Sequence, residues 1–157
     1  MGKINWKLLI GLIILCQMAG VIGSFFTASS IPSWYMTLNK PSFNPPNSVF
    51  APVWISLYTL MGCSLYLIWT EKRTKKTKNA INWFYAQLVL NTVWSIAFFG
   101  LKDIFLGLVI ILALIAVLAI TMIKFYRINK NSFGLLVPYF LWCCFAAILN
   151  YNLWVLN

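Results

Sequence analysis

Residues 104–123 read IFLGLVIILALIAVLAITMI, a run in which every side chain is apolar or small. A helix needs roughly 20 such residues to cross about 30 Å of hydrocarbon. In lipid the run must be helical, because a helix satisfies its own backbone hydrogen bonds. The same rule predicts five membrane-spanning helices, over about 6–26, 49–70, 80–100, 104–124 and 133–155. We therefore expect an all-α polytopic membrane protein, a bundle of five transmembrane helices that forms a single domain over residues 1–157.

The composition supports a membrane location. The chain has 157 residues, of which 62% are hydrophobic and 9% are charged, and soluble domains run nearer half apolar and a quarter charged. A cleaved signal peptide is the alternative for the first helix, because Lys3 and Lys7 precede its apolar run. That run, from Leu8 to Phe26, covers about 19 residues, whereas the apolar part of a signal peptide usually spans about 7–15. A retained helix is the favoured interpretation.

The net charge of +10 is distributed unevenly along the chain. Only Lys40 and Lys102 fall at one end of the predicted bundle. The basic residues at the other end are Lys3, Lys7, Lys72, Arg73, Lys75, Lys76, Lys78, Lys124, Arg127 and Lys130. The positive-inside rule then predicts a multi-pass cell-membrane protein with a cytoplasmic N-terminus, and with the C-terminus and the loop 27–48 outside. The charge therefore indicates topology and contact with anionic lipid headgroups, and we expect no nucleic-acid partner.

The residue types present exclude several kinds of chemistry. The chain contains no histidine, and its acidic residues are Glu71 and Asp103, both in predicted loops. Ion-coupled carriers usually keep ionisable groups inside the membrane. The four cysteines fall inside predicted helices without metal-ligand spacing and are expected to be small buried hydrophobes. We therefore expect no metal site and no required cofactor, and a conventional hydrolase, metalloenzyme or ion-coupled pump is disfavoured.

Aromatic and amide side chains share faces on three predicted helices. Gln87, Asn91, Trp94 and Phe98 recur at helical spacing. Similar faces carry Trp54, Tyr58 and Met61 on 49–70, and Trp142, Ala146, Leu149 and Asn150 on 133–155. Hydrogen bonding of the amides between helices, and an interfacial belt of tryptophans, are the structural alternatives. If the three faces converge, they form a cavity that opens toward the outside.

The predicted outer loop, 27–48, has an unusual composition for a membrane protein. It contains WYMTLNKPSFNPP (34–46), with three prolines that fix φ and three aromatic rings that need a surface to pack on. Loops longer than about 15 residues are uncommon and usually functional or disordered. We expect a structured lid over the outer end of the bundle. A loop that merely rests on headgroups is the alternative.

These segments together resemble bacterial members of the TspO/MBR family, the tryptophan-rich sensory and translocator proteins, which includes the peripheral benzodiazepine receptor. The matching residues are Trp34-Tyr35, Leu38, Lys40-Pro41, Pro45-Pro46, VFAPVWISLYTLMG (49–62), QLVLNTVWSIAFFG (87–100) and PYFLWCCFAAILNYNLW (138–154). The resemblance covers about residues 10 to 156. It implies a five-helix bundle, often a homodimer, with a ligand pocket covered by the first outer loop.

The resemblance also implies ligands and site residues. Family members bind porphyrins, sterols and benzodiazepine-like compounds, and the pocket residues would be Tyr35, Pro45, Trp54, Asn91, Trp94, Phe98, Trp142 and Ala146. Some bacterial relatives are reported to promote light-dependent breakdown of protoporphyrin IX, for which Trp54 is the matching catalytic candidate. The sterol motif of animal members is incomplete, because no basic residue follows Tyr151.

We therefore expect a membrane receptor or sensor that binds protoporphyrin IX-like tetrapyrroles or other flat apolar ligands in a tryptophan-lined pocket. Light-dependent porphyrin degradation by a pocket tryptophan is one alternative, and it requires no acid/base residue. A tetrapyrrole or sterol transporter is another, although no inverted repeat or coupling residue is visible. A binding protein is favoured over an enzyme.

Overall fold

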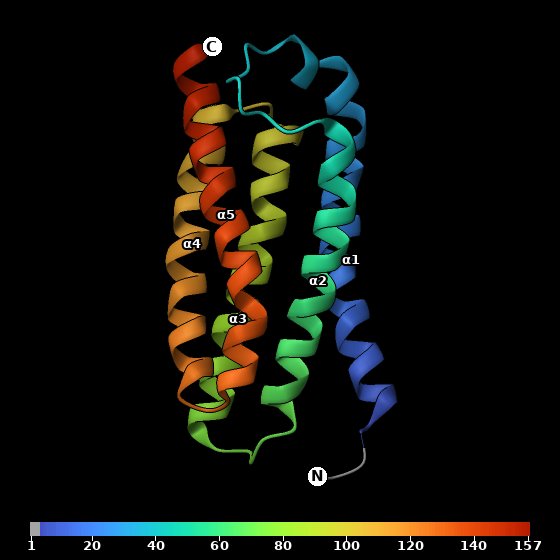
Figure 1. Ribbon diagram of the computed structural model, residues 1–157, viewed down its shortest axis with the longest axis vertical. Helices are drawn as coiled ribbons and strands as arrows, with labels where there is room; N and C mark the ends of the chain where they lie inside the picture. Colours follow the sequence, from blue (N-terminus) through green and yellow to red (C-terminus); the bar gives the residue numbers. More distant parts are fainter. Residues whose placement is uncertain (1–3) are drawn as a thin grey trace.

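The computed structural model describes residues 4–157, so Lys3 lies outside the described residues. The helices are α1 (Trp6–Ser33), α2 (Asn47–Trp69), α3 (Lys75–Ser95), α4 (Ile104–Tyr126) and α5 (Lys130–Leu156). Two short elements accompany them, the 3-10 turn η1 (Tyr35–Thr37) and the π-helical turn η2 (Ile96–Gly100). The five helices run alongside one another, with the loop between α1 and α2 at the same end as the C-terminus (Figure 1).

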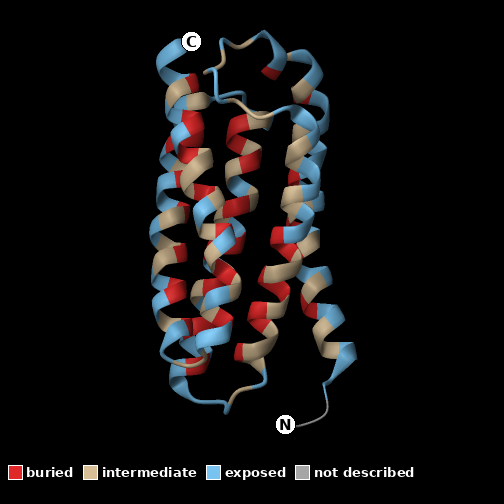
Figure 2. Ribbon diagram, in the orientation of Figure 1, coloured by how far each residue is buried: buried red, intermediate tan, exposed pale blue. Residues whose placement is uncertain are grey.

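The helices close into a ring. α1 packs against α2 and α3, α2 packs against α5, and α4 packs between α3 and α5. Buried residues face the inside of this ring, and exposed residues cover its outside (Figure 2). The exposed positions include many large apolar side chains, such as Ile14, Phe25 and Leu112. An apolar outer surface of this extent suits a bundle embedded in lipid, and the predicted all-α polytopic membrane fold is confirmed.

Within residues 4–157, four of the helices are long and apolar enough to cross a membrane: α1, α2, α4 and α5. α3 falls short because it starts among lysines and carries Gln87 and Asn91. Both amides are buried, whereas Val89 and Val93 are exposed on the same helix. α3 therefore turns its polar face to the interior of the bundle and an apolar face outward.

The first helix is longer than the sequence predicts. α1 ends at Ser33 rather than near residue 26, so the predicted loop 27–48 is wrong at its start, and the connection to α2 covers only 34–46. The hydroxyl of Thr27 donates to the carbonyl of Gly23, and that of Ser33 donates to Ser29. Ser30 donates to the carbonyl of Phe99 at 2.7 Å. The polar residues after Phe26 thus bond to helical carbonyls and do not end the helix.

α3 also differs from its predicted bounds of 80–100. It begins at Lys75 because Thr74 forms a capping box with Thr77, so the three lysines from 75 to 78 belong to the first helical turn. Its last segment, 96–100, is the π turn η2, closed by a bond from the Leu101 N–H to the carbonyl of Ile96. The other three helices agree with their predicted bounds to within three residues. At α5, Asn129 accepts from the N–H of Asn131 and of Ser132 and so sets the earlier start.

Candidate functional site

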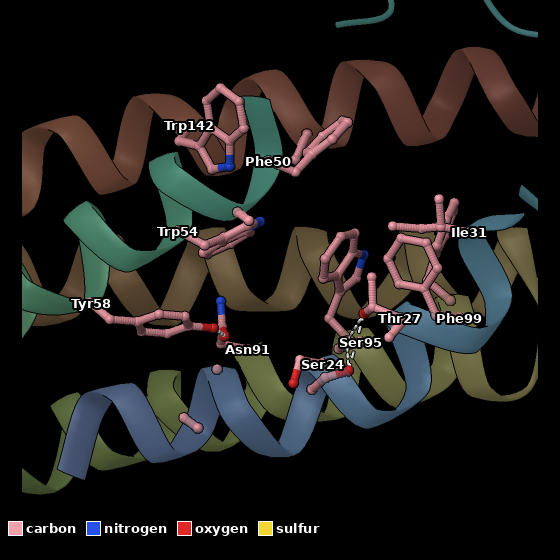
Figure 3. Close-up of a pocket in the computed structure, with 18 of the residues that line it drawn as sticks. Ser24, Thr27, Ile31, Phe50, Trp54, Tyr58, Asn91, Ser95, Phe99 and Trp142 are labelled. Atoms are coloured by element: carbon pink, nitrogen blue, oxygen red, sulfur yellow. Dashed lines mark hydrogen bonds between the residues drawn. The ribbon is translucent and has the colours of Figure 1, made fainter. Parts of the chain in front are cut away.

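A cavity of about 460 Å³ lies in the half of the bundle near the α1–α2 loop. Its walls come from α1, α2, α3, η2 and α5, and Tyr35 contributes from η1. Among the described helices α4 contributes no wall residue. Side chains from opposite walls point toward a shared interior, as Trp54, Trp142 and Asn91 do (Figure 3).

Seven of the eight predicted site residues line this cavity: Tyr35, Trp54, Asn91, Trp94, Phe98, Trp142 and Ala146. The aromatic faces that the spacing predicted on three helices therefore converge. The eighth residue, Pro45, is not part of the wall, since the loop reaches the cavity through Tyr35. Contact of any of these residues with a ligand stays a prediction.

The aromatic rings of the wall pack in a connected series. Trp54 stacks on Tyr58 with ring centroids 5.5 Å apart and lies 6.4 Å from Trp94. Trp94 in turn stacks on Phe98 at 5.6 Å. On the opposite side, Trp142 contacts Phe50 edge to face at 6.2 Å. Offset and edge-to-face pairs hold rings in fixed positions, so the cavity offers preformed aromatic faces to a flat ligand.

The inner end of the cavity is closed by a buried hydrogen-bond network. The hydroxyl of Tyr58 donates to Oδ1 of Asn91 at 2.5 Å, and Nδ2 of Asn91 donates to the hydroxyl of Tyr139 at 3.1 Å. Asn91 thus joins α3 to α2 and α5, as the structural interpretation of the amides predicted, and it also lines the cavity. Gln87 lies one turn before Asn91 on α3. It is fully buried and is not part of the cavity wall. Its amide has no hydrogen-bond partner among the described residues.

The polar groups nearer the loop are also paired. Trp94 Nε1 donates to Oδ1 of Asn150 at 3.3 Å, and Nδ2 of Asn150 donates to the carbonyl of Ile104. The hydroxyls of Thr27 and Ser95 lie 3.0 Å apart and connect α1 to α3. No acidic or basic residue of the described chain is part of the wall. The interior is therefore mainly apolar, with a few fixed polar groups, which is typical of small-molecule sites.

The α1–α2 loop is tied to the bundle at two points. The buried Tyr35 packs against Phe98 and Phe99, and its hydroxyl donates to Oδ1 of Asn44 at 2.7 Å. Burial raises the pKa of Tyr35 to about 12, against a weaker lowering by that hydrogen bond. The second point is the pair Asn39 and Asn157, which exchange bonds: the Asn39 N–H donates to Asn157 Oδ1, and Asn157 Nδ2 donates to the Asn39 carbonyl. These contacts pack the loop against the bundle, and its role as a lid stays a prediction.

Lys40 belongs to this loop and does not line the cavity. Its ammonium group donates to the carbonyls of Met36 and Leu38 and lies 5.0 Å from the centre of the Tyr35 ring. The cation therefore stabilises the turn that carries Tyr35.

Sequence reasoning missed the α1 wall of the cavity. The missed residues are Gln17, Ala19, Gly20, Val21, Gly23, Ser24, Thr27, Ala28 and Ile31. Most are small and recur at helical spacing, a pattern that any close helix contact also produces. Phe50 and Phe99 were missed as well. Phe99 reaches the wall together with Phe98 because a π turn adds a residue to the last turn of the helix.

The comparisons with known proteins agree over nearly the whole chain. The sequence profile of the TspO/MBR family matches residues 12–155. The chain is 43% identical to the tryptophan-rich protein TspO of Archaeoglobus fulgidus, over 88% of this chain and 89% of that protein. It is 34% identical to the human translocator protein, over 95% and 89% of the two chains. It is 30% identical to the tryptophan-rich sensory protein of Cereibacter sphaeroides, over 99% and 94%. The chain therefore belongs to the TspO/MBR family of membrane sensor and translocator proteins.

Proposed function

We propose that this protein is a membrane receptor that binds a porphyrin or another flat apolar ligand in the cavity between its helices. The observation that carries the proposal is the convergence of Trp54, Trp94 and Trp142, from three helices, on one interior. A volume of about 460 Å³ falls within the range of roughly 300–1,000 Å³ for sites that hold drug-sized ligands. The tetrapyrrole ring is flat and aromatic, so it can stack on preformed indole faces.

The polarity of the wall favours the same class of ligand. The wall carries few polar groups, and most of them already bond to one another. A ligand with many hydrogen-bonding groups would lose its bonds to water without replacement. A macrocycle with an apolar body avoids this cost if its charged substituents stay near the mouth. The binding needs no metal and no cofactor beyond the ligand itself.

The test is a titration of the purified protein with protoporphyrin IX, followed by the absorbance and fluorescence of the porphyrin. Trp54→Phe shrinks one stacking surface and Trp142→Ala removes another, a combined loss of about 2 kcal/mol, so the Kd of the double variant should rise roughly 30-fold. Trp154→Ala is the matched control, since Trp154 is exposed and lies outside the wall. An unchanged Kd in the double variant would show that porphyrin binds elsewhere.

Light-dependent breakdown of porphyrin is the second candidate. Its supporting observation is that Trp54 contacts Tyr58, Trp94 and Tyr139, a set of rings that can share an unpaired electron. The same samples distinguish it from binding. Absorbance lost in light but not in the dark, and retained in Trp54→Phe, would indicate degradation.

The topology and the assembly complete the proposal. The basic residues near the α2–α3 and α4–α5 connections face the cytoplasm, and the α1–α2 loop and the C-terminus face outside. Membrane lipids are then partners at both ends.

The protein is a homodimer that associates through α4, which lines no part of the cavity and exposes Ala113 and Ala116 for close helix contact. The mass of the detergent-solubilised protein distinguishes this dimer from a monomer.

A further inference from the structure

Two stripes of exposed residues, one on α1 and one on α2, border the cavity. The α1 stripe contains Val21, Ser24 and Ala28, and the α2 stripe contains Asn47, Ala51 and Ile55. These residues line the cavity, and each of them is also exposed. The cavity is only partly enclosed, so the exposed residues of its wall mark where it reaches the surface. The seam between α1 and α2 is therefore open along these stripes.

The seam is closed toward the other end of the bundle. Nε2 of Gln17 donates to the carbonyl of Ile55 at 2.9 Å and to the hydroxyl of Thr59 at 3.1 Å. One turn further from the loop, a Cβ on Gly62 would come within 2.8 Å of Cγ1 of Ile13, so the two helices touch there. The ring of Tyr58 on α2 fills the space that a side chain at Gly20 on α1 would occupy, so the helices also touch there. α1 and α2 thus contact each other at these residues. The opening lies between these contacts and the α1–α2 loop.

The opening lies at the depth of the hydrocarbon. Exposed large apolar residues extend along α1 from Ile10 to Phe26, and Val21 and Ser24 fall within that stretch. On α2, Ile55 is 59% exposed and lies within the predicted membrane span. The small side chains of Ser24, Ala28 and Ala51 leave room between the helices. What adjoins the opening is therefore lipid acyl chain rather than water.

We propose that the seam between α1 and α2 is a side opening through which an apolar ligand passes between the surrounding hydrocarbon and the cavity. The inference rests on the proposed binding function for the identity of the ligand, but the opening itself is a property of the empty protein. A flat apolar molecule dissolves in the bilayer, so this route spares it a passage through water. The α1–α2 loop, which Tyr35 and Asn39 hold against the bundle, can then stay closed while ligand exchanges.

The first experiment needs no porphyrin. The protein is reconstituted into vesicles of phosphatidylcholine with brominated acyl chains, because bromine quenches an indole only on contact. Ala28→Phe combined with Ala51→Phe fills the opening from both helices. The matched control is Ser29→Phe with Ser48→Phe, which adds the same rings at exposed positions outside the wall. Lipid quenching of the tryptophans should fall in the filled variant and stay at the wild-type level in the control. Equal quenching in both variants overturns the side opening.

The second experiment measures the exchange of protoporphyrin IX with the same variants by stopped flow. Filling the opening should lower the association rate constant of protoporphyrin IX about tenfold, because a blocked route raises the barrier to entry. Unchanged rates in the filled variant, with faster exchange in Pro45→Gly plus Pro46→Gly, would assign passage to the loop and overturn the proposed route. Failure of the wild-type protein to bind porphyrin counts against the proposed ligand, while the lipid-quenching result still decides whether the opening exists. Equal thermal unfolding of the variants shows that all are folded.

Discussion

Tyr35 connects the loop to the wall of the cavity through a single side chain. Its ring lines the interior and packs on Phe98 and Phe99, while its hydroxyl donates to Asn44 nine residues later. Tyr35→Phe keeps the ring and removes that hydrogen bond. We expect a loss of about 1 kcal/mol in the free energy of unfolding, measured as a lower Tm in detergent. Oδ1 of Asn44 would then lack its donor, and a Tm equal to that of the wild type would show that the bond contributes nothing.

The pH dependence of the same variant follows from the raised pKa. The phenol of Tyr35 ionises at about 12 in the folded protein and near 10 in the unfolded chain. Below pH 10 both states are protonated and the stabilisation is complete. As the pH rises from 10 toward 12 the unfolded chain alone loses the proton, so the wild type loses stability. Tyr35→Phe should lose less stability across this window, which a comparison of Tm values at pH 9 and pH 11 checks.

Helical spacing correctly predicted which residues line the cavity where these residues share one face of a helix. It placed Asn91, Trp94 and Phe98 together, and all three line the cavity. It could not separate Asn91 from Gln87, which lies on the same face. Asn91 meets two tyrosine hydroxyls from other helices, and Gln87 meets no partner among the described residues. That difference depends on which side chains the neighbouring helices present at each depth, and one helix does not encode it.

The α1–α2 loop is held as an element by Asn39 and Asn157. Two bonds join the loop to the amide of Asn157, and Nδ2 of Asn39 donates to the carbonyl of Leu156. Asn157→Ala removes the first two, so hydrogen exchange in peptides that cover 36–46 should become about tenfold faster, as expected for the loss of roughly 1.4 kcal/mol. Asn152→Ala is the control, because its amide donates to Ile148 within α5. Equal exchange in the two variants would show that the two bonds to Asn157 do not hold the loop.

The ends of elements were harder to predict than their existence. Hydropathy ended α1 near residue 26 because serine and threonine follow, but their hydroxyls bond to carbonyls of α1 and η2. The π turn at the end of α3 has no signal in the apolar pattern, since it depends on the bond from Leu101 to Ile96. Lys102, with φ of 57°, then reverses the chain into α4. Such ends are set by local hydrogen bonds, which an average over many residues does not resolve.

At the scale of the whole molecule, the sequence predicted five helices but not the ring in which they pack. The position of α1 against both α2 and α3 is what makes it a wall of the cavity. Its small residues at helical spacing were compatible with any tight helix contact. The sequence predicted the cavity walls only on α2, α3 and α5. On these helices aromatic residues stand where a membrane helix usually carries aliphatic ones. The side facing α1 depends on the order of helices around the ring, which no single segment specifies.

The topology is a property of the whole chain, because it depends on charges from all of its connections. Lys72, Arg73 and Lys75 lie near the α2–α3 connection, at the opposite end of the bundle from the α1–α2 loop (Figure 1). The positive-inside rule predicts that the lysine-rich end faces the cytoplasm. Cysteine introduced as Ser42→Cys, at an exposed loop position, should react with a membrane-impermeant maleimide on intact cells. Lys75→Cys, also at an exposed position, should react only after the membrane is permeabilised. The unmodified chain sets the background from its own four cysteines, two of which are buried and two partly buried. Labelling of Lys75→Cys but not Ser42→Cys on intact cells would invert the topology and place the α1–α2 loop inside the cell.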